Sequence, residues 1–183
     1  MKRRITILVV IVMLVVMALP ISSKAARIVD ISNHWASTTI QLWIDEGFIS
    51  GYPDGRFRPD NNISRAEFVT MINKVYNYTA KNQIGFSDVH VGDWYYNAIS
   101  IARAAGYLNG YPDNTVKPND PITREEAASM LVKIANLQTN STAANIFKDA
   151  YTMTWSKSAI GAVVLAKIMV GYDDGTFKAN NYI

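Results

Sequence analysis

The stretch Gly51-Tyr52-Pro53-Asp54-Gly55 recurs twice along the chain with small changes. Its copies are Gly110-Tyr111-Pro112-Asp113-Asn114 and Gly171-Tyr172-Asp173-Asp174-Gly175, at successive offsets of 59 and 61 residues. A tryptophan stands 16 residues before each Gly-Tyr pair, and an aspartate lies five or six residues before each tryptophan. Three markers in a constant order, three times over, indicate a protein built from three repeats. The tryptophans are Trp35, Trp94 and Trp155, and the aspartates are Asp30, Asp88 and Asp149.

Each repeat has the pattern of a helix, a tight loop and a second helix. In the first repeat, Ile40 and Ile44 fall on one face of a 3.6-residue period, and Gly47 is placed to end that helix. The loop that follows has Pro-Asp-Gly turn chemistry, because proline fixes φ and glycine accepts a φ above zero. The second helix opens at Ser64, and its equivalent in the second repeat opens at Thr123. A glutamate follows each of them three residues later, which is the capping box of a helix start.

The pattern predicts an all-α fold of three helix-loop-helix repeats and divides the chain into four segments. They are a signal peptide over residues 1–25, repeat 1 over 28–78, repeat 2 over 85–138 and an incomplete repeat 3 over 146–183. Repeat 3 stops at Ile183, the equivalent of the residue just before each capping box. We therefore expect its second helix to lie in a longer polypeptide. The residues that we expect to be partly uncovered without that helix are Ile160, Val163 and Leu165.

The N-terminal segment explains the charge of the chain. Lys2-Arg3-Arg4 precedes fifteen residues without a charged side chain and then the small residues around Ala25, which is the pattern of a signal peptide cleaved after Ala25 or one residue later. The alternative is a membrane anchor, but at ~1.5 Å per residue the run spans about 22 Å, less than the ~30 Å hydrocarbon core. Of the 18 lysines and arginines, four lie in this segment, so residues 26–183 hold 14 against 15 acidic residues. No basic footprint for nucleic acid remains.

The order of these motifs resembles the S-layer homology domain family over residues 28–183. The resemblance implies a bundle with pseudo-threefold symmetry and grooves between the repeats. It also implies non-covalent attachment to a secondary cell-wall polysaccharide on bacterial peptidoglycan, often one that carries pyruvate ketals, and a passenger domain in a longer polypeptide. The polysaccharide-binding residues that it implies are Arg65, Arg124, Asp30, Asp88, Asp149, Trp35, Trp94, Trp155, Gly51, Gly110 and Gly171. Repeat 3 departs from the pattern, because it has no motif arginine.

The residues themselves leave two interpretations open at most of these positions. Arg65 and Arg124 fall at the first position of a helix, where free backbone N–H groups and a guanidinium would bind a carboxylate. A salt bridge to an aspartate of the neighbouring repeat is the structural alternative. Each tryptophan either packs in the core or stacks on a sugar. The aspartates cap a helix or a loop unless they contact ligand, and the loop glycines provide either a φ above zero or room for a ligand.

No catalytic residue, metal site or cofactor is predicted. The chain has two histidines and no cysteine, and it lacks the common hydrolase, zinc-protease and phosphate-loop motifs. A calcium loop is disfavoured, because Arg56, Phe57 and Arg58 stand where oxygen ligands would be needed. We expect a secreted protein of the cell wall or S-layer that is not an enzyme and has no nucleic-acid partner, and no membrane contact after signal cleavage. The alternative is a structural S-layer or protein–protein interaction module that binds no polysaccharide.

Overall fold

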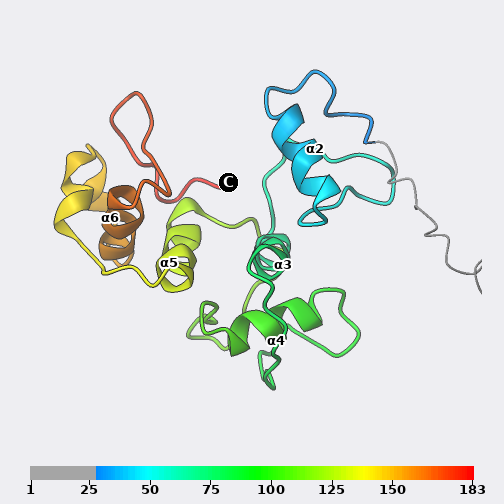
Figure 1. The fold of residues 1–183 in the computed structure, drawn as a ribbon. Helices are drawn as coiled ribbons and strands as arrows, with labels where there is room; N and C mark the ends of the chain where they lie inside the picture. The colour runs from blue at the N-terminus through cyan, green and yellow to red at the C-terminus, as the bar shows by residue number, and fades with distance from the viewer. Residues whose placement is uncertain (1–27) are drawn as a thin grey trace, which may run out of the picture.

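The computed structural model describes residues 28–183, so the predicted signal peptide lies outside the described residues. This part of the chain is all-α, as predicted, with no β-strand and two isolated bridges (Figure 1). Within it, no helix is long and apolar enough to cross a membrane. The α-helices are α2 (Ser37–Asp45), α3 (Arg65–Val75), α4 (Tyr96–Ala104), α5 (Arg124–Ile134) and α6 (Lys157–Leu165), and the 3-10 helices are η1 (Thr142–Ile146) and η2 (Ala150–Thr152).

The helix ends follow the local sequence signals. The Ser64 hydroxyl accepts the N–H of Glu67 at 3.2 Å, and the Glu67 carboxylate accepts the Ser64 N–H at 2.8 Å, so the capping box is complete. Thr123 forms the same box at the start of α5. Gly47 follows α2 with a φ of 76°, the left-handed conformation that favours glycine at a helix end. After α6 the equivalent residue is Lys167, with a φ of 57°.

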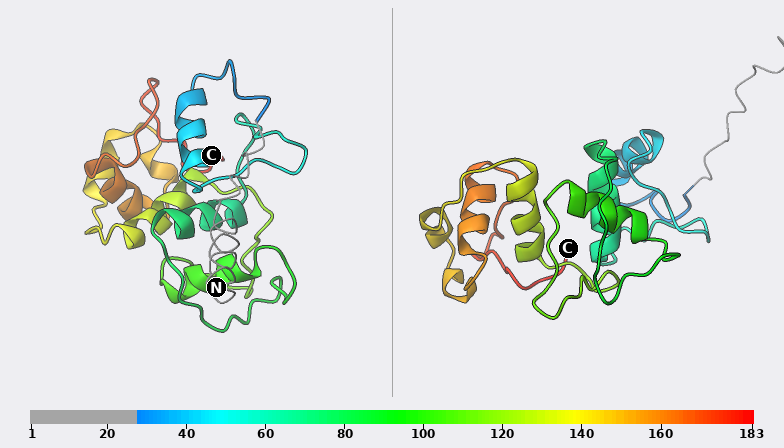
Figure 2. Two further views of the ribbon diagram at one scale, coloured as in Figure 1. Left: turned by 45° about the vertical axis from the view of Figure 1, so that its right-hand side comes forward. Right: turned by 90° about the horizontal axis from the view of Figure 1, so that it is seen from below.

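Helices pair between repeats and not within them. Helix α3 of repeat 1 packs against α4 of repeat 2, and α5 of repeat 2 packs against α6 of repeat 3, which η1 also covers. Figure 2 shows α5 and α6 side by side, and the α3–α4 pair next to them. Each pair is the centre of one apolar cluster. Fully buried members are Val69, Ile99, Leu108 and Ile122 in the first cluster and Ile160, Val163 and Phe177 in the second.

This pairing overturns the expectation that Ile160 and Val163 are partly uncovered. Both are completely buried, because α5 and η1 already cover α6. Leu165 is exposed, but it lies at the last position of the helix. Among the helices of residues 28–183, it is α2 that has no helix packed along it, and the side chain of Leu42 on α2 is 55% exposed.

The three repeats meet in a closed cycle of main-chain hydrogen bonds. The Ile63 N–H donates to the carbonyl oxygen of Ile183 at 2.8 Å, Ile122 donates to Ile63 at 3.0 Å, and Ile183 donates to Ile122 at 3.2 Å. Each isoleucine directly precedes the N-cap of a helix or holds the equivalent position, so the cycle joins equivalent points of the repeats. Figure 1 shows the C-terminal residue at the middle of the molecule, between α2 and α5. A pseudo-threefold bundle of helices stays a prediction, because α2 has no helical partner in the described part.

Candidate functional site

The repeat-start aspartates hold the loop of their own repeat. The Asp30 carboxylate accepts the backbone N–H groups of Phe57 and Arg58, both at 2.8 Å. The first of these bonds is the main reason that the pKa of Asp30 lies below its ordinary value. Arg58 has a φ of 59°, so the carboxylate fixes a conformation that a non-glycine residue seldom adopts. The equivalent bonds join Asp88 to Val116 and Lys117, and Asp149 to Phe177 and Lys178.

The glycine that begins each loop is needed for close packing. Neither Gly110 nor its equivalents have the positive φ that was one interpretation of the sequence. A Cβ atom at Gly110 would lie 2.8 Å from the carbonyl oxygen of Thr115 and would overlap the Phe86 ring. Gly51 and Gly171 are equally enclosed, by Ile28 and Phe147 respectively. The positive φ falls on the fifth loop residue instead, at Gly55, Asn114 and Gly175.

Arg65 is buried between repeats 1 and 2, with 3% of its surface exposed. Its Nε donates to the carbonyl oxygen of Val116 at 2.8 Å, and its Nη1 lies 3.2 Å from the Glu126 carboxylate. The guanidinium carbon lies 4.9 Å from the centre of the Tyr111 ring. The predicted alternative of a salt bridge to the neighbouring repeat therefore forms, although with a glutamate and not with an aspartate.

Arg124 makes the equivalent contacts between repeats 2 and 3 but is partly exposed. Its Nε donates to the carbonyl oxygen of Phe177 at 2.9 Å, and its Nη2 donates to that of Val170 at 2.7 Å. The guanidinium lies over Tyr172, with 4.9 Å between its carbon and the ring centre. Within residues 28–183 no carboxylate pairs with this side chain. Its charge thus remains more available to a ligand than that of Arg65.

The expected free N–H groups beside these arginines are absent. The backbone N–H groups of Arg65 and Ala66 donate to the carbonyl oxygens of Asp120 and Pro118, at 3.0 and 2.9 Å. The start of α5 makes the same pair of bonds to the loop of repeat 3. This correction removes the backbone anion site predicted at these helix starts, because its donors are used to join one repeat to the next.

The repeat-start tryptophans lie on the surface. Trp35 is 91% exposed, Trp94 61% and Trp155 57%, so the interpretation as core residues is wrong. Trp43, in contrast, is half-buried and packs edge-on against Phe48. Large aromatic side chains held at equivalent exposed positions in every repeat are suited to stack on a ligand.

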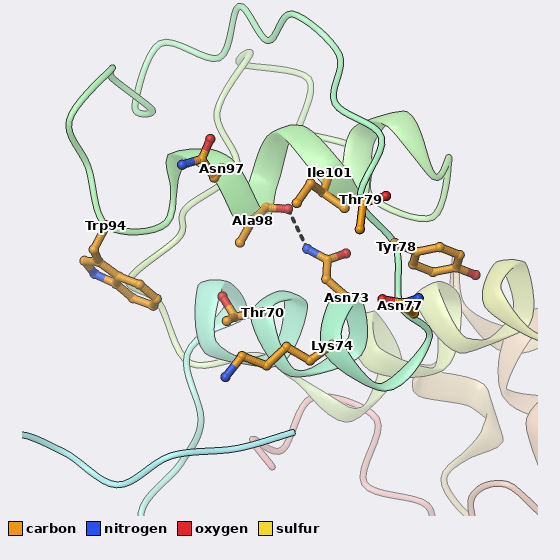
Figure 3. A pocket seen from close by; sticks show the side chains of 10 residues that line it. All are labelled: Thr70, Asn73, Lys74, Asn77, Tyr78, Thr79, Trp94, Asn97, Ala98 and Ile101. Carbon is orange, nitrogen blue, oxygen red and sulfur yellow. Dashed lines mark hydrogen bonds between the residues drawn. The ribbon is translucent and has the colours of Figure 1, made fainter. Parts of the chain in front are cut away.

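A groove with a volume of about 380 Å³ lies between α3 and α4, with Trp94 at one end (Figure 3). At its floor the Asn73 amide donates to the carbonyl oxygen of Ala98 at 2.9 Å, which ties the two helices together. Figure 3 shows Lys74 extended along α3 on the side where Trp94 lies. The polar residues that line the groove are Thr70, Asn73, Lys74, Asn77, Thr79 and Asn97, and the apolar ones are Tyr78, Trp94, Ala98 and Ile101.

The structure thus brings most of the predicted site residues together in two sets. Arg65 joins Asp88 and Gly110 through the loop of repeat 2, and the second set is Arg124, Asp149 and Gly171. Asp30 and Gly51 meet no motif arginine within residues 28–183. The sequence interpretation did not single out the groove residues Lys74, Asn77 and Asn97. For the first two a signal existed, since Lys133 and Asn136 hold the same positions in repeat 2, whereas the equivalents of Asn97 share only polarity.

A module of helical repeats that presents aromatic side chains at equivalent surface positions belongs to the class of repeat-built binding modules. Within that class, the family model of the S-layer homology domain matches residues 27–69, 85–128 and 146–183. The chain therefore belongs to the S-layer homology domain family, which confirms the resemblance in its motifs.

Curated relatives include surface proteins and a long enzyme. The chain is 33% identical to "Exoglucanase XynX" of Acetivibrio thermocellus over 160 residues, 84% of this chain and 15% of that protein. It is 31% identical to "S-layer protein sap" of Bacillus anthracis over 160 residues, 85% of this chain and 19% of that protein. A "Cellulosome-anchoring protein" of Acetivibrio thermocellus is 36% identical over 105 residues, 54% of this chain and 23% of that protein. The chain spans less than a quarter of the length of each of these relatives. Its membership of the same domain family as these surface proteins supports a cell-wall-anchoring role for the module.

Proposed function

We propose that the chain is a non-covalent anchor that attaches a secreted protein to the cell wall or S-layer by binding an anionic secondary cell-wall polysaccharide, for which a pyruvylated polymer is the expected type. The observation that carries the proposal is the α3–α4 groove with Trp94 exposed at its end. The named S-layer and cellulosome-anchoring relatives support the location. The module has a binding role and no catalytic one, and a passenger domain in a longer polypeptide belongs to the same proposal.

The lining of the groove matches the chemistry of an acidic sugar. A ring face stacks on an indole, and sugar hydroxyls bond to amides and hydroxyls such as those of Asn97 and Thr70. Lys74 supplies a positive charge for a ketal carboxylate. We assign direct contact to the tryptophans and Lys74, and also to the partly exposed Arg124.

In this proposal the remaining predicted site residues have a structural role near the bound polymer. Arg65, the three aspartates and the three loop glycines hold the loops that border each boundary between repeats. Any contact that they make with the sugar is added to that structural role. Replacing one of them would therefore change folding as well as binding.

The test is binding of the mature chain to purified sacculi, before and after removal of the non-peptidoglycan polymer. We expect binding only to the intact sacculi, and weaker binding once the pyruvate groups are removed. Trp94→Ala should weaken binding about fivefold, equivalent to ~1 kcal/mol, while the melting temperature stays close to that of the parent. Tyr151→Ala is the matched control, since Tyr151 is 83% exposed and lies outside the groove. Equal binding to stripped sacculi would contradict the assignment of the ligand to the non-peptidoglycan polymer, and absence of binding to both preparations would favour the protein–protein alternative.

A further inference from the structure

Several polar groups of the α3–α4 groove already use their hydrogen bonds inside the protein. The Asn73 amide donates to the Ala98 carbonyl oxygen at 2.9 Å, and its side-chain oxygen accepts the Tyr107 hydroxyl at 2.7 Å. The Thr70 hydroxyl donates to the carbonyl oxygen of Ala66 at 2.8 Å, so only its oxygen remains, as an acceptor. These contacts restrict what the groove can offer to a ligand.

The side chain of Asn97 is held by a lysine from outside the groove. Lys81 lies in the linker between α3 and α4, and its Nζ donates to the Asn97 Oδ1 at 2.8 Å. An ammonium group has three donors and no acceptor, so it bonds to the oxygen of an amide and not to the nitrogen. Figure 3 shows this oxygen directed away from α3 and the Asn97 nitrogen on the side of Trp94. The two N–H donors of Asn97 are therefore left for a ligand.

The opposite wall of the groove supplies further donors. Lys74 extends along α3 towards the end where Trp94 lies, and its ammonium forms no ion pair with a carboxylate of residues 28–183. None of the residues that line the groove is acidic. An ionised carboxylate has only acceptors, so donors from both walls beside an indole ring match an acidic sugar.

The contact between Lys81 and Asn97 is specific to the boundary of repeats 1 and 2. At the next boundary the counterpart of Lys81 is Asn140 and that of Asn97 is Ser158. There the main-chain N–H of Asn140 donates to the carbonyl oxygen of Ser158 at 3.0 Å. A linker can thus lie against its helix without a lysine side chain.

The linker of repeat 1 also has an anchor that does not involve Lys81. The Ser100 hydroxyl donates to the carbonyl oxygen of Asn82 at 2.6 Å, which holds the linker on α4. Removing the Lys81 ammonium therefore leaves the attachment of the linker in place. What it changes is the freedom of the Asn97 amide to turn.

We propose that Lys81 is a positioning residue of the polysaccharide groove, which holds the N–H donors of Asn97 towards the ligand. Asn97 and Lys74 then bind the carboxylate of the acidic sugar from opposite walls. The inference rests on the proposed function and deepens it, because it names how the groove selects an anionic polymer. A free amide would also turn its oxygen towards the groove, where that oxygen would face the ligand carboxylate.

The first test needs no ligand and uses the isotopically labelled mature chain. The side-chain amide signals of Asn97, assigned by their loss in Asn97→Asp, should shift or broaden in Lys81→Met. Lys81→Arg should keep the parent signals, since a guanidinium also has only donors. Gln83→Met is the matched control on the same exposed linker and should leave them unchanged. Unchanged signals in Lys81→Met would overturn the proposal.

The second test is binding to intact sacculi. Lys81→Met should bind about threefold more weakly at an unchanged melting temperature, because the apparent affinity falls with the fraction of amides in the binding orientation. Lys81→Arg and Gln83→Met should bind like the parent. In an Asn97→Ala background, Lys81→Met should have no further effect, because the residue through which it acts is gone.

Two binding results would overturn the inference alone. If Lys81→Met weakens binding equally with and without Asn97, then the lysine acts on the polymer directly. If it has no effect while Trp94→Ala weakens binding, the groove binds the polymer without help from Lys81. Failure of the parent itself to bind intact sacculi would instead contradict the proposed function, and this inference with it.

Discussion

Arg65 and Arg124 occupy the same place in the repeat pattern, but they differ in what surrounds them. Arg65 is buried and lies beside the Glu126 carboxylate, whereas Arg124 is partly exposed and bonds to carbonyl oxygens. Glu126 lies in the first turn of α5, the second helix of repeat 2. Repeat 3 has no equivalent glutamate within residues 28–183. The environment of each arginine is thus set by the repeat that follows it.

We expect Arg65→Ala to lower the free energy of unfolding by about 3–5 kcal/mol, because it leaves the partly buried Glu126 carboxylate without its cation. Arg124→Ala should cost about 1.5–3 kcal/mol, the range for lost hydrogen bonds to a charged group. Arg65→Lys should recover little of the loss, since an ammonium cannot reproduce the two-sided contact. Urea unfolding of the three variants measures this. Equal losses for both alanine variants would show that burial of Arg65 is not the cause.

Gly110 illustrates a residue whose role depends on space and not on backbone conformation. Gly110→Ala should destabilise the protein by about 1–3 kcal/mol, because the new Cβ meets the Phe86 ring and the Thr115 carbonyl oxygen. Gly85→Ala is the matched control, since a Cβ there has no neighbour within 4 Å and φ is not in the left-handed region. It should be neutral or slightly stabilising. If thermal melts place both variants at the parent value, the packing argument fails at this glycine.

At the scale of the elements, local sequence signals predicted where helices begin and end, but they did not predict which helices pack together. The capping boxes at Ser64 and Thr123 and the stop at Gly47 involve only residues a few positions apart, so the sequence contains all that they need. The pairing of α3 with α4 is not encoded locally, since the apolar stripe of a helix does not determine which other helix packs against it. The same gap explains the wrong expectations for the tryptophans and for Val163, whose exposure depends on which helix lies next to them.

The caps also make stability depend on pH. Burial raises the pKa of Glu126, but the Thr123 N–H, the Tyr111 hydroxyl and Arg65 outweigh it, so the pKa lies below its ordinary value of 4.5. The pKa of Glu67 is lowered in the same way, with burial opposed by Ser64 and Tyr52. A lowered pKa means that the folded state binds fewer protons than the unfolded one as pH falls. The stabilisation is therefore complete above about pH 4.5 and is lost as pH drops through the folded-state pKa values.

We expect the free energy of unfolding to be nearly constant between about pH 7 and 5 and to fall below pH 4.5. Glu126→Gln should be less stable than the parent at pH 7, because the ion pair with Arg65 is lost. The difference should shrink towards pH 3, where the parent glutamate also becomes neutral. Denaturant unfolding at each pH decides the point. If the difference in the free energy of unfolding between the two proteins stayed constant with pH, protonation of Glu126 would not contribute to the loss of stability in acid.

At the scale of the whole molecule, three repeats are closed by one small cycle, while the α-helices form two pairs within residues 28–183. The cycle of Ile63, Ile122 and Ile183 is complete even though α2 lacks a helical partner. The order of the repeats therefore depends on main-chain bonds at the centre as well as on the apolar clusters. The sequence showed the equivalence of the three isoleucines, but not that they bond to one another.

Removing Tyr182 and Ile183 should break the cycle selectively. Two of its three hydrogen bonds involve Ile183, so the free energy of unfolding should fall by about 2 kcal/mol, at roughly 1 kcal/mol for each bond. The melting temperature should then fall by about 4–8 °C for a chain of this size. Tyr182→Ala is the control, because it keeps the main-chain bonds and removes a side chain that is half exposed.

Amide exchange gives the sharper result: the Ile63 N–H loses its acceptor and should exchange faster, whereas the Ile122 N–H keeps Ile63 as acceptor and should remain protected. If both amides exchange as in the parent, the cycle does not hold the repeats together, and the apolar clusters alone must do so.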